Sequence, residues 1–191
     1  MEDQLAISRI KQGDPGGLEV LVKRYQVKAV YAAYLILQDR SLSEEVTQTA
    51  FVRVVEKVHQ FDDSRPFSPW FFRIVVNLAV KIAKEQTRFT GWDEESEENS
   101  GFLAKWLIDP QPHPEKLFEQ KEFTQTIRAA LKHLSPEQRS VVVMRYFLEM
   151  SEADMAIKLE RPVSTIKWWL RSARHRLGIL LRASRYFKDQ E

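Results

Sequence analysis

The chain has 191 residues, of which 43% are hydrophobic and 29% are charged, and its formal net charge is only +2. This composition suits one globular domain or two small ones. The absence of cysteine excludes disulfides and thiolate metal sites. No stretch approaches the roughly 20 apolar residues that a membrane-spanning helix needs, and the first residues lack the basic start and apolar core of a secretory signal. We therefore expect a cytoplasmic protein with no membrane insertion.

The charges are distributed unevenly along the chain. An acidic block, DEESEE, covers residues 93–98, whereas no Asp or Glu occurs between Arg161 and Lys188. Because local charge, and not the small net charge, selects a charged partner, the basic C-terminal segment points to nucleic acid.

Residues 1–87 are predicted to form a first all-α module. Asp14 and Pro15 are a cap and a first-position signal for a helix. Ser41 or Ser43 is expected to start a later helix, in which valine or alanine recurs at every fourth position. The segment FDDSRPFSP is expected to be a loop because it contains two prolines and an Asp pair. The predicted helices cover about residues 3–12, 15–38, 41–59 and 69–86.

Residues 88–114 are predicted to be a flexible linker, since they hold the acidic block and three prolines. Residues 115–191 are then expected to form a second small helical module. Ser135 and Gln138 form a capping box around Pro136, and Ser151 repeats this start signal for a short helix. The predicted helices cover about residues 115–133, a stretch after Ser135, a stretch from Ser151 to 159, and 163–187.

The last two of these helices, joined by a turn at residues 160–162, have the pattern of a helix-turn-helix, a motif that places its second helix in a DNA groove. The apolar residues of the final helix recur at three- and four-residue steps and are expected to be buried: Ile166, Leu170, Ala173, Leu177 and Leu180. The remaining face carries the candidate DNA contacts: Ser164, Thr165, Lys167, Trp168, Arg171, Arg174 and Arg176. The alternative is a solvated basic face without a ligand.

Three segments of the chain resemble the extracytoplasmic-function (ECF) group of bacterial sigma factors. LSPEQRSVVVMRYFLEMSEADMAIKLERPVSTIKWWLRSARHRL resembles the fourth conserved region of that family. AISRIKQGDPGGLEVLVKRYQ and LSEEVTQTAFVRVVEKVHQFDDSRPFSPWFFRIVVNLA resemble its second region. The resemblance implies a transcription initiation factor that binds core RNA polymerase. Its first module would contact the β′ clamp helices and read and melt the −10 promoter element. Its second module would read the −35 element and contact the β flap. An anti-sigma factor is the expected inhibitor.

The resemblance also carries over residue by residue. The polymerase-binding positions are Asp39, Glu44, Glu45 and Gln48, whose alternative role is ordinary helix solvation. The −10 positions are Asp63, Ser64, Arg65 and Phe67 in the loop and Arg73, Asn77, Lys81 and Lys84 on the following helix. The DNA candidates of the final helix become −35 contacts.

Several positions stay open or depart from the family pattern. Trp70 is expected to pack in the core, although base stacking is the alternative, and Asn77 is either a capping residue or a base contact. Leu42 and Thr49 stand where the family often has an acid. The pair Trp168-Trp169 replaces a small residue and an Arg, and Glu160 stands where Gly is common in the turn.

An enzyme is not expected. The four histidines are scattered, and neither a glycine-rich phosphate loop nor a nucleophile motif occurs, so we predict no catalytic residue, metal or cofactor. Two other functions remain as alternatives. One is a stand-alone helix-turn-helix regulator, and the other is a polymerase-binding adapter that no longer melts DNA.

Overall fold

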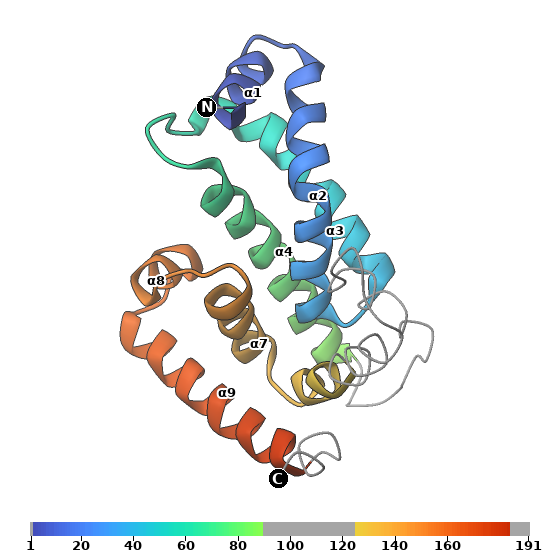
Figure 1. The fold of residues 1–191 in the computed structure, drawn as a ribbon, viewed down its shortest axis with the longest axis vertical. Helices are drawn as coiled ribbons and strands as arrows, with labels where there is room; N and C mark the ends of the chain where they lie inside the picture. The colour runs from blue at the N-terminus through green and yellow to red at the C-terminus, as the bar shows by residue number, and fades with distance from the viewer. Residues whose placement is uncertain (1, 90–124, 184–191) are drawn as a thin grey trace, which may run out of the picture. The chain divides into compact units, whose positions relative to one another are not determined.

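The structure, a computed structural model, describes residues 2–89 and 125–183 (Figure 1). Within these two ranges all regular structure is helical, which confirms the predicted all-α class. The chain divides into two compact units, Met1–Ala83 and Lys84–Glu191.

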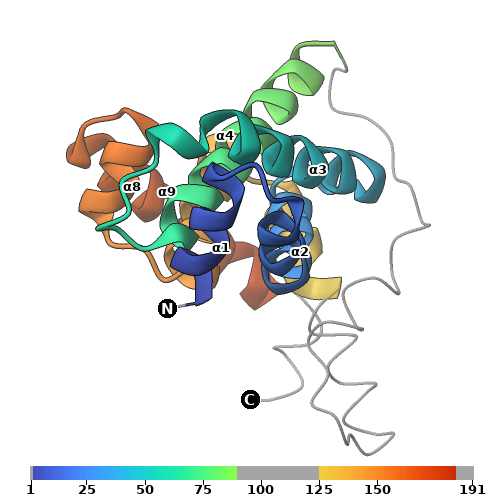
Figure 2. The same ribbon diagram turned by 90° about the horizontal axis from the view of Figure 1, so that it is seen from above.

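The first unit is built on α2 (Pro15–Leu37), which packs against both α1 (Glu2–Lys11) and α3 (Arg40–Lys57) (Figures 1 and 2). Asp14 caps α2 as predicted, since its carboxylate accepts a hydrogen bond of 2.8 Å from the Gly16 amide. Gly17 permits the close approach of α1, because a Cβ at this position would lie 2.3 Å from the Ala6 carbonyl oxygen. The start of α2 is therefore fixed by a cap on one side and by backbone contact on the other.

The predicted start of α3 is wrong by one to three residues. Asp39 is the N-cap, since its side chain accepts a hydrogen bond of 2.9 Å from the Leu42 amide. Ser43 lies inside the helix, where its hydroxyl donates to the Asp39 carbonyl and its side chain is fully buried. The four-residue apolar repeat is confirmed, because its members are all buried: Val46, Ala50, Val54 and Val58.

A 3-10 turn, η1 (Val58–Gln60), and a short loop connect α3 to α4 (Phe67–Phe89). The helix starts two residues earlier than predicted because Pro69 falls in its first turn, where an amide has no intrahelical acceptor to lose. It also extends through residues 88 and 89, so the first two residues of the predicted linker are helical. The rest of that linker, with its acidic block, lies outside the described residues, as do residues 115–124 of the following predicted helix.

Aromatic side chains form the core of the first unit. Phe71 is completely buried, and its ring centroid lies 4.6 Å from that of Phe51 and 5.6 Å from that of Phe67. Tyr25 contacts the same rings from α2. Burial of large rings in such tilted and stacked pairs stabilises a small helical unit more strongly than aliphatic contacts of the same number.

The second unit contains a helix at 125–132, then α7 (Pro136–Val142), a π-helical turn η3 (Val143–Phe147), α8 (Glu152–Leu159) and α9 (Val163–Ala183). The capping box at Ser135 and the cap at Ser151 are both present as predicted. Glu160 ends α8 with φ 53°, in the left-handed region, which explains why Gly is favoured at this turn.

The apolar stripe of α9 is only partly as predicted. Ile166, Leu170 and Ala173 are buried, whereas Leu177 and Leu180 remain partly exposed. The helix-turn-helix pairs α8 with α9, and α7 packs on α9 as well, so the first three turns of α9 receive most of the packing. Residues 184–187 of the predicted final helix lie outside the described residues.

Candidate nucleic-acid interface

The open face of α9 carries the residues expected to contact duplex DNA. Thr165 is partly buried, and the other six are exposed: Ser164, Lys167, Trp168, Arg171, Arg174 and Arg176. Trp168 has 63% of its surface exposed, which is unusual for so large an apolar side chain. A helix with donors and an aromatic ring on one face, and no acid within its length, suits contact with a DNA groove and its phosphates.

Polar contacts from α7 hold this helix in place. Gln138 accepts from the Ser135 amide through Oε1, and its Nε2 donates to the Ser172 hydroxyl at 2.9 Å. One side chain therefore completes a cap and also fixes the register of α9 against α7. The pairing of Gln138 with Ser172 could not be read from the sequence, since 34 positions separate the two residues.

In the first unit, Asp62 organises the loop between α3 and α4. Its Oδ1 accepts from the Ser64 amide at 3.0 Å and from the Ser64 hydroxyl at 2.6 Å, and its Oδ2 lies 3.1 Å from the Arg65 Nε. The Ser64 hydroxyl and amide, with the nearby Arg65 charge, lower the pKa of Asp62 below its ordinary value. The turn is thus closed by a carboxylate that stays ionised in neutral solution.

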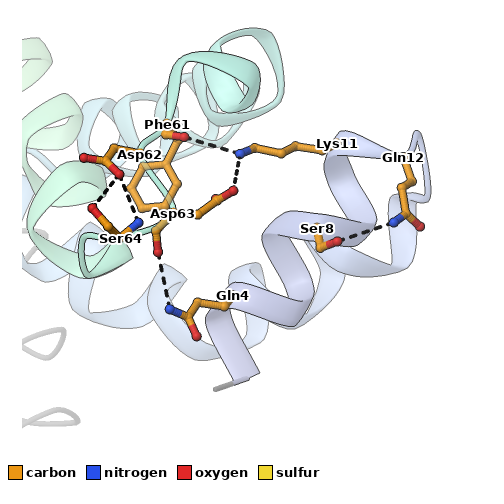
Figure 3. A network of polar contacts seen from close by, with 8 residues as sticks. All are labelled: Gln4, Ser8, Lys11, Gln12, Phe61, Asp62, Asp63 and Ser64. Carbon is orange, nitrogen blue, oxygen red and sulfur yellow. Dashed lines mark hydrogen bonds and ion pairs between the residues drawn. The ribbon is translucent and has the colours of Figure 1, made fainter.

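The neighbouring Asp63 is tied to α1 (Figure 3). The Lys11 ammonium lies 2.7 Å from the Asp63 Oδ2 and donates to the Phe61 carbonyl at 3.3 Å. Gln4 donates to the Asp63 backbone carbonyl, also at 3.3 Å. Sequence reasoning missed Lys11 and Gln4, because no local pattern links them to loop residues that lie 50 or more positions away.

Phe67 was expected on the loop, but it lies inside the core at the start of α4, with 2% of its surface exposed. Trp70 packs on Phe61 and Phe67 at ring distances of 5.0 and 5.8 Å, as expected, but it is only partly buried and lies at the edge of the core. Asn77 is exposed in the middle of α4, so it caps no helix end. Arg73 and Lys84 are partly buried, and Lys81 is exposed.

The residues predicted to bind polymerase lie along α3. Asp39 caps the helix, and Glu44 forms an ion pair with Arg40 at 2.9 Å, so both have structural partners in this chain. Glu45 and Gln48 are exposed.

The same face of α3 carries apolar side chains that sequence reasoning missed. Val52 and Val55 are 57% and 43% exposed, and they follow Glu45 and Gln48 at helical spacing. The signal was present, since these two valines fall outside the four-residue core repeat. We refer to Glu45, Gln48, Val52 and Val55 as the α3 face.

The described residues hold no cluster of three or more His, Asp or Glu side chains placed to bind a metal ion. Among the same residues, none of the helices is long and apolar enough to cross a membrane.

Family models match both halves of the chain. The family model for sigma-70 region 2 matches residues 21–89, and that for sigma-70 region 4 matches residues 124–177. The chain is 27% identical over 177 residues to the ECF sigma factor SigW of Bacillus subtilis, which covers 92% of this chain and 95% of SigW. It is 25% identical over 170 residues to the ECF sigma-E factor of Escherichia coli K12, covering 87% of each.

Two solved structures share the fold. The structure of CnrH in complex with the cytosolic domain of CnrY aligns with a TM-score of 0.66 at 23% identity, over 96% of this chain and 99% of that one. The sigma factor RpoE of Bartonella quintana, in complex with the anti-sigma factor NepR, aligns with a TM-score of 0.61 at 22% identity, over 87% and 96%.

The order of the matches, region 2 followed by region 4, reproduces the order of the two helical units. Full-length relatives of the same kind favour an initiation factor over a stand-alone regulator. The chain therefore belongs to the ECF sigma factors, the transcription initiation factors that direct RNA polymerase to promoters.

Proposed function

We propose that the two units read different parts of a promoter, with residues 1–87 at the −10 element and residues 115–191 at the −35 element, joined by the linker 88–114. The observation that carries this proposal is the exposed basic face of α9, which is the second helix of the helix-turn-helix and contains no acid. Recognition helices of this motif present such a face to the major groove.

At the −35 element, the first turns of α9 are placed to meet base edges. Lys167 and Arg171 are donors for bases or phosphates, and the exposed Trp168 ring suits contact with a thymine methyl or a sugar. Arg174 and Arg176 lie further along the helix and are assigned to phosphates, as are later residues in this motif. Ser164 and Thr165 stand at the start of α9, where short hydroxyl side chains reach the backbone or a base.

At the −10 element, the loop of residues 61–66 offers Ser64 and Arg65 to a single strand, since both are exposed. A strand that has left the duplex needs cations and hydrogen-bonding edges. Arg73, Asn77, Lys81 and Lys84 extend this surface along α4. Phe67 and Asp63 support the loop and need not touch DNA.

The α3 face is assigned to the β′ clamp helices of core polymerase. An apolar pair flanked by polar side chains, exposed on a rigid helix, suits a contact with another protein. The second unit would contact the β flap. The chain would act in the cytoplasm, with polymerase performing the catalysis and the chain supplying none.

An anti-sigma factor is the proposed inhibitor. The supporting observation is that a solved relative is held by a protein of this class, and another by the cytosolic domain of a second protein. Such a partner would cover the α3 face, α9 or both, because these are the surfaces that polymerase and DNA require.

Transcription in vitro with core polymerase tests the proposal. Promoter sequences are first selected from a fork-junction DNA library with randomised −10 and −35 elements. Promoter-specific initiation that depends on the chain is expected, and Arg171→Ala should reduce it, whereas Lys132→Ala, an exposed cation outside α9, should not.

The alternatives give different results. Specific duplex binding by the free chain without any gain in initiation would establish a stand-alone regulator. Binding to polymerase with no promoter opening would establish an adapter.

A further inference from the structure

The ion pair between α1 and the loop of residues 61–66 is less exposed on its cationic side than the Lys23–Glu19 pair on α2. The Lys11 side chain is only 24% exposed, whereas both members of the Lys23–Glu19 pair on α2 are more than 60% exposed. Lys11 also makes two contacts at once, with the Asp63 carboxylate and the Phe61 carbonyl. A partly buried ammonium with two acceptors holds its partners more firmly than an isolated surface pair.

Residues at both ends of α1 take part in this contact (Figure 3). Gln4 and Lys11 are seven positions apart, which is two helical turns, so they lie on one face of α1. Gln4 binds the Asp63 carbonyl and Lys11 binds its carboxylate, so the residue is fixed through both its backbone and its side chain. The loop is thereby attached to a helix that lies outside the matched region 2, which begins at residue 21.

The rest of the loop is also fixed from inside. Phe61 and Phe67 are buried at its two ends, and Asp62 closes the turn between them. All residues from Asp62 to Pro66 are exposed, and Ser64, Arg65 and Pro66 form the tip beyond the two aspartates. The position of this tip thus depends on Asp63, and Asp63 is held by α1.

The charges give Lys11 a second effect. A carboxylate beside a DNA strand repels its phosphates, and this repulsion acts over roughly 10 Å at moderate salt. With the Lys11 ammonium 2.7 Å away, Asp63 belongs to a neutral pair. Lys11 therefore places the loop and also offsets the charge of Asp63, while Arg65 lies beside the second carboxylate of the loop, Asp62.

We propose that Lys11 is a positioning residue for promoter melting, which acts through Asp63 to hold the loop of residues 61–66 in its DNA-binding conformation. This inference depends on the proposed role of the loop at the −10 element. Lys11 itself need not contact DNA.

The test uses the full chain assembled with core polymerase, and the readouts are the rate of promoter opening and the discrimination among −10 bases on fork-junction DNA. Lys11→Met keeps the aliphatic stem and removes the ammonium. We expect roughly a two- to fivefold loss in opening rate, the scale of one ion pair, and weaker discrimination among −10 bases. Binding to −35 duplex should stay unchanged. Lys23→Met, which breaks an exposed ion pair in the same unit, should alter neither readout.

A double-mutant comparison separates positioning from general destabilisation. Asp63→Asn should produce a smaller loss, because it removes the same contact without leaving a carboxylate beside the DNA. Adding it to Lys11→Met should cost nothing further and should recover the part of the loss that is due to repulsion. Lys11→Arg should retain most of the opening rate. A fall in thermal stability with unchanged base discrimination would reduce Lys11 to a structural residue and overturn the proposal.

The variant Arg65→Ala tests the proposed role of the loop separately from the proposed role of Lys11. If it leaves −10 discrimination intact, the loop does not read DNA, and the proposed function of the loop fails. If Arg65→Ala reduces discrimination and Lys11→Met does not, the loop reads DNA without help from α1. Only the positioning role of Lys11 then fails.

Discussion

The two candidate DNA-binding surfaces are built in opposite ways. On α9 the backbone is fixed by helical hydrogen bonds and the functional side chains point to solvent, with the nearest acid, Glu152, 4.0 Å from Lys167. In the loop of residues 61–66 the backbone has no regular structure, and Asp62 and Asp63 are used to hold it. The helix keeps its shape through backbone hydrogen bonds, whereas the loop uses two of its polar residues for this purpose.

The difference matches what each surface would have to recognise. A duplex presents a groove of regular width, and a rigid helix fits it without adjustment. A melted strand presents separate bases, and a loop can surround a base only if the loop is already ordered. In this chain, a functional loop requires more supporting residues than a functional helix.

The largest expected effect concerns the aromatic core beneath the loop. Phe71→Ala removes a completely buried ring that contacts Phe51 and Phe67. We expect a loss of about 3–5 kcal/mol in the free energy of unfolding of the first unit. Hydrogen exchange followed by mass spectrometry should show faster exchange in α2 and α4, while α9 keeps its protection. Val52→Ala, at an exposed site, is the control. Loss of protection in α9 would mean that the two units unfold together.

A smaller effect is expected where α1 meets α2. Gly17→Ala places a methyl group 2.3 Å from the Ala6 carbonyl oxygen, and the resulting displacement of α1 should cost about 1–3 kcal/mol. Gly178→Ala on α9 meets nothing within 4 Å and should stabilise the second unit by roughly 0.5–1 kcal/mol. Thermal unfolding of the two variants should therefore shift in opposite directions. A neutral Gly17→Ala would show that α1 is free to move.

Arg171 and Arg65 test whether the two surfaces act separately. Arg171→Ala should weaken holoenzyme binding to −35 duplex by about 1–3 kcal/mol if it reads a base. A purely phosphate contact would instead lower the salt dependence of binding by about one counterion at every sequence. Arg65→Ala should leave duplex binding unchanged and affect fork-junction DNA alone. If Arg65→Ala weakened binding to both DNAs equally, the two units would not bind separate promoter elements.

The smallest effect is the titration of Asp62. Its pKa is lowered by the Ser64 hydroxyl and amide, so the ionised form supports the folded loop above the ordinary pKa of 3.8, and this support is lost as pH falls through the lower folded value. Carboxyl NMR shifts should give a midpoint below 3.8 for Asp62. In Ser64→Ala the midpoint should rise toward 3.8. A midpoint at or above 3.8 in the unmodified chain would show that Ser64 does not donate its hydrogen bonds to Asp62.

Local signals predicted the helices well. Asp14, Ser135 and Ser151 cap the helices that the sequence assigned to them, since a cap needs only a few neighbouring residues. The N-cap was harder to predict where several candidate residues lie close together. Asp39, and not Ser41 or Ser43, caps α3, because Ser43 belongs to the buried face of this helix.

The candidate sites were predictable where they lie on a helix face and less so where they lie on a loop. The spacing of Ile166, Leu170 and Ala173 placed the open face of α9 correctly. Phe67 was assigned to the loop because Pro69 suggested a later helix start, and the tertiary contacts of the ring decided otherwise. Lys11 and Gln4 could not be found, since their partners are 50 or more positions away.

The contact between Lys11 and Asp63 also constrains how these two positions can evolve. The two residues are separated by 52 positions, yet each gives the other its role. A substitution at one of them leaves a lone charge next to the loop of residues 61–66, and a second substitution at the other restores balance. Among relatives that keep α1, these two positions should therefore be inherited as a pair, and exchanged pairs of opposite polarity should occur more often than either single change.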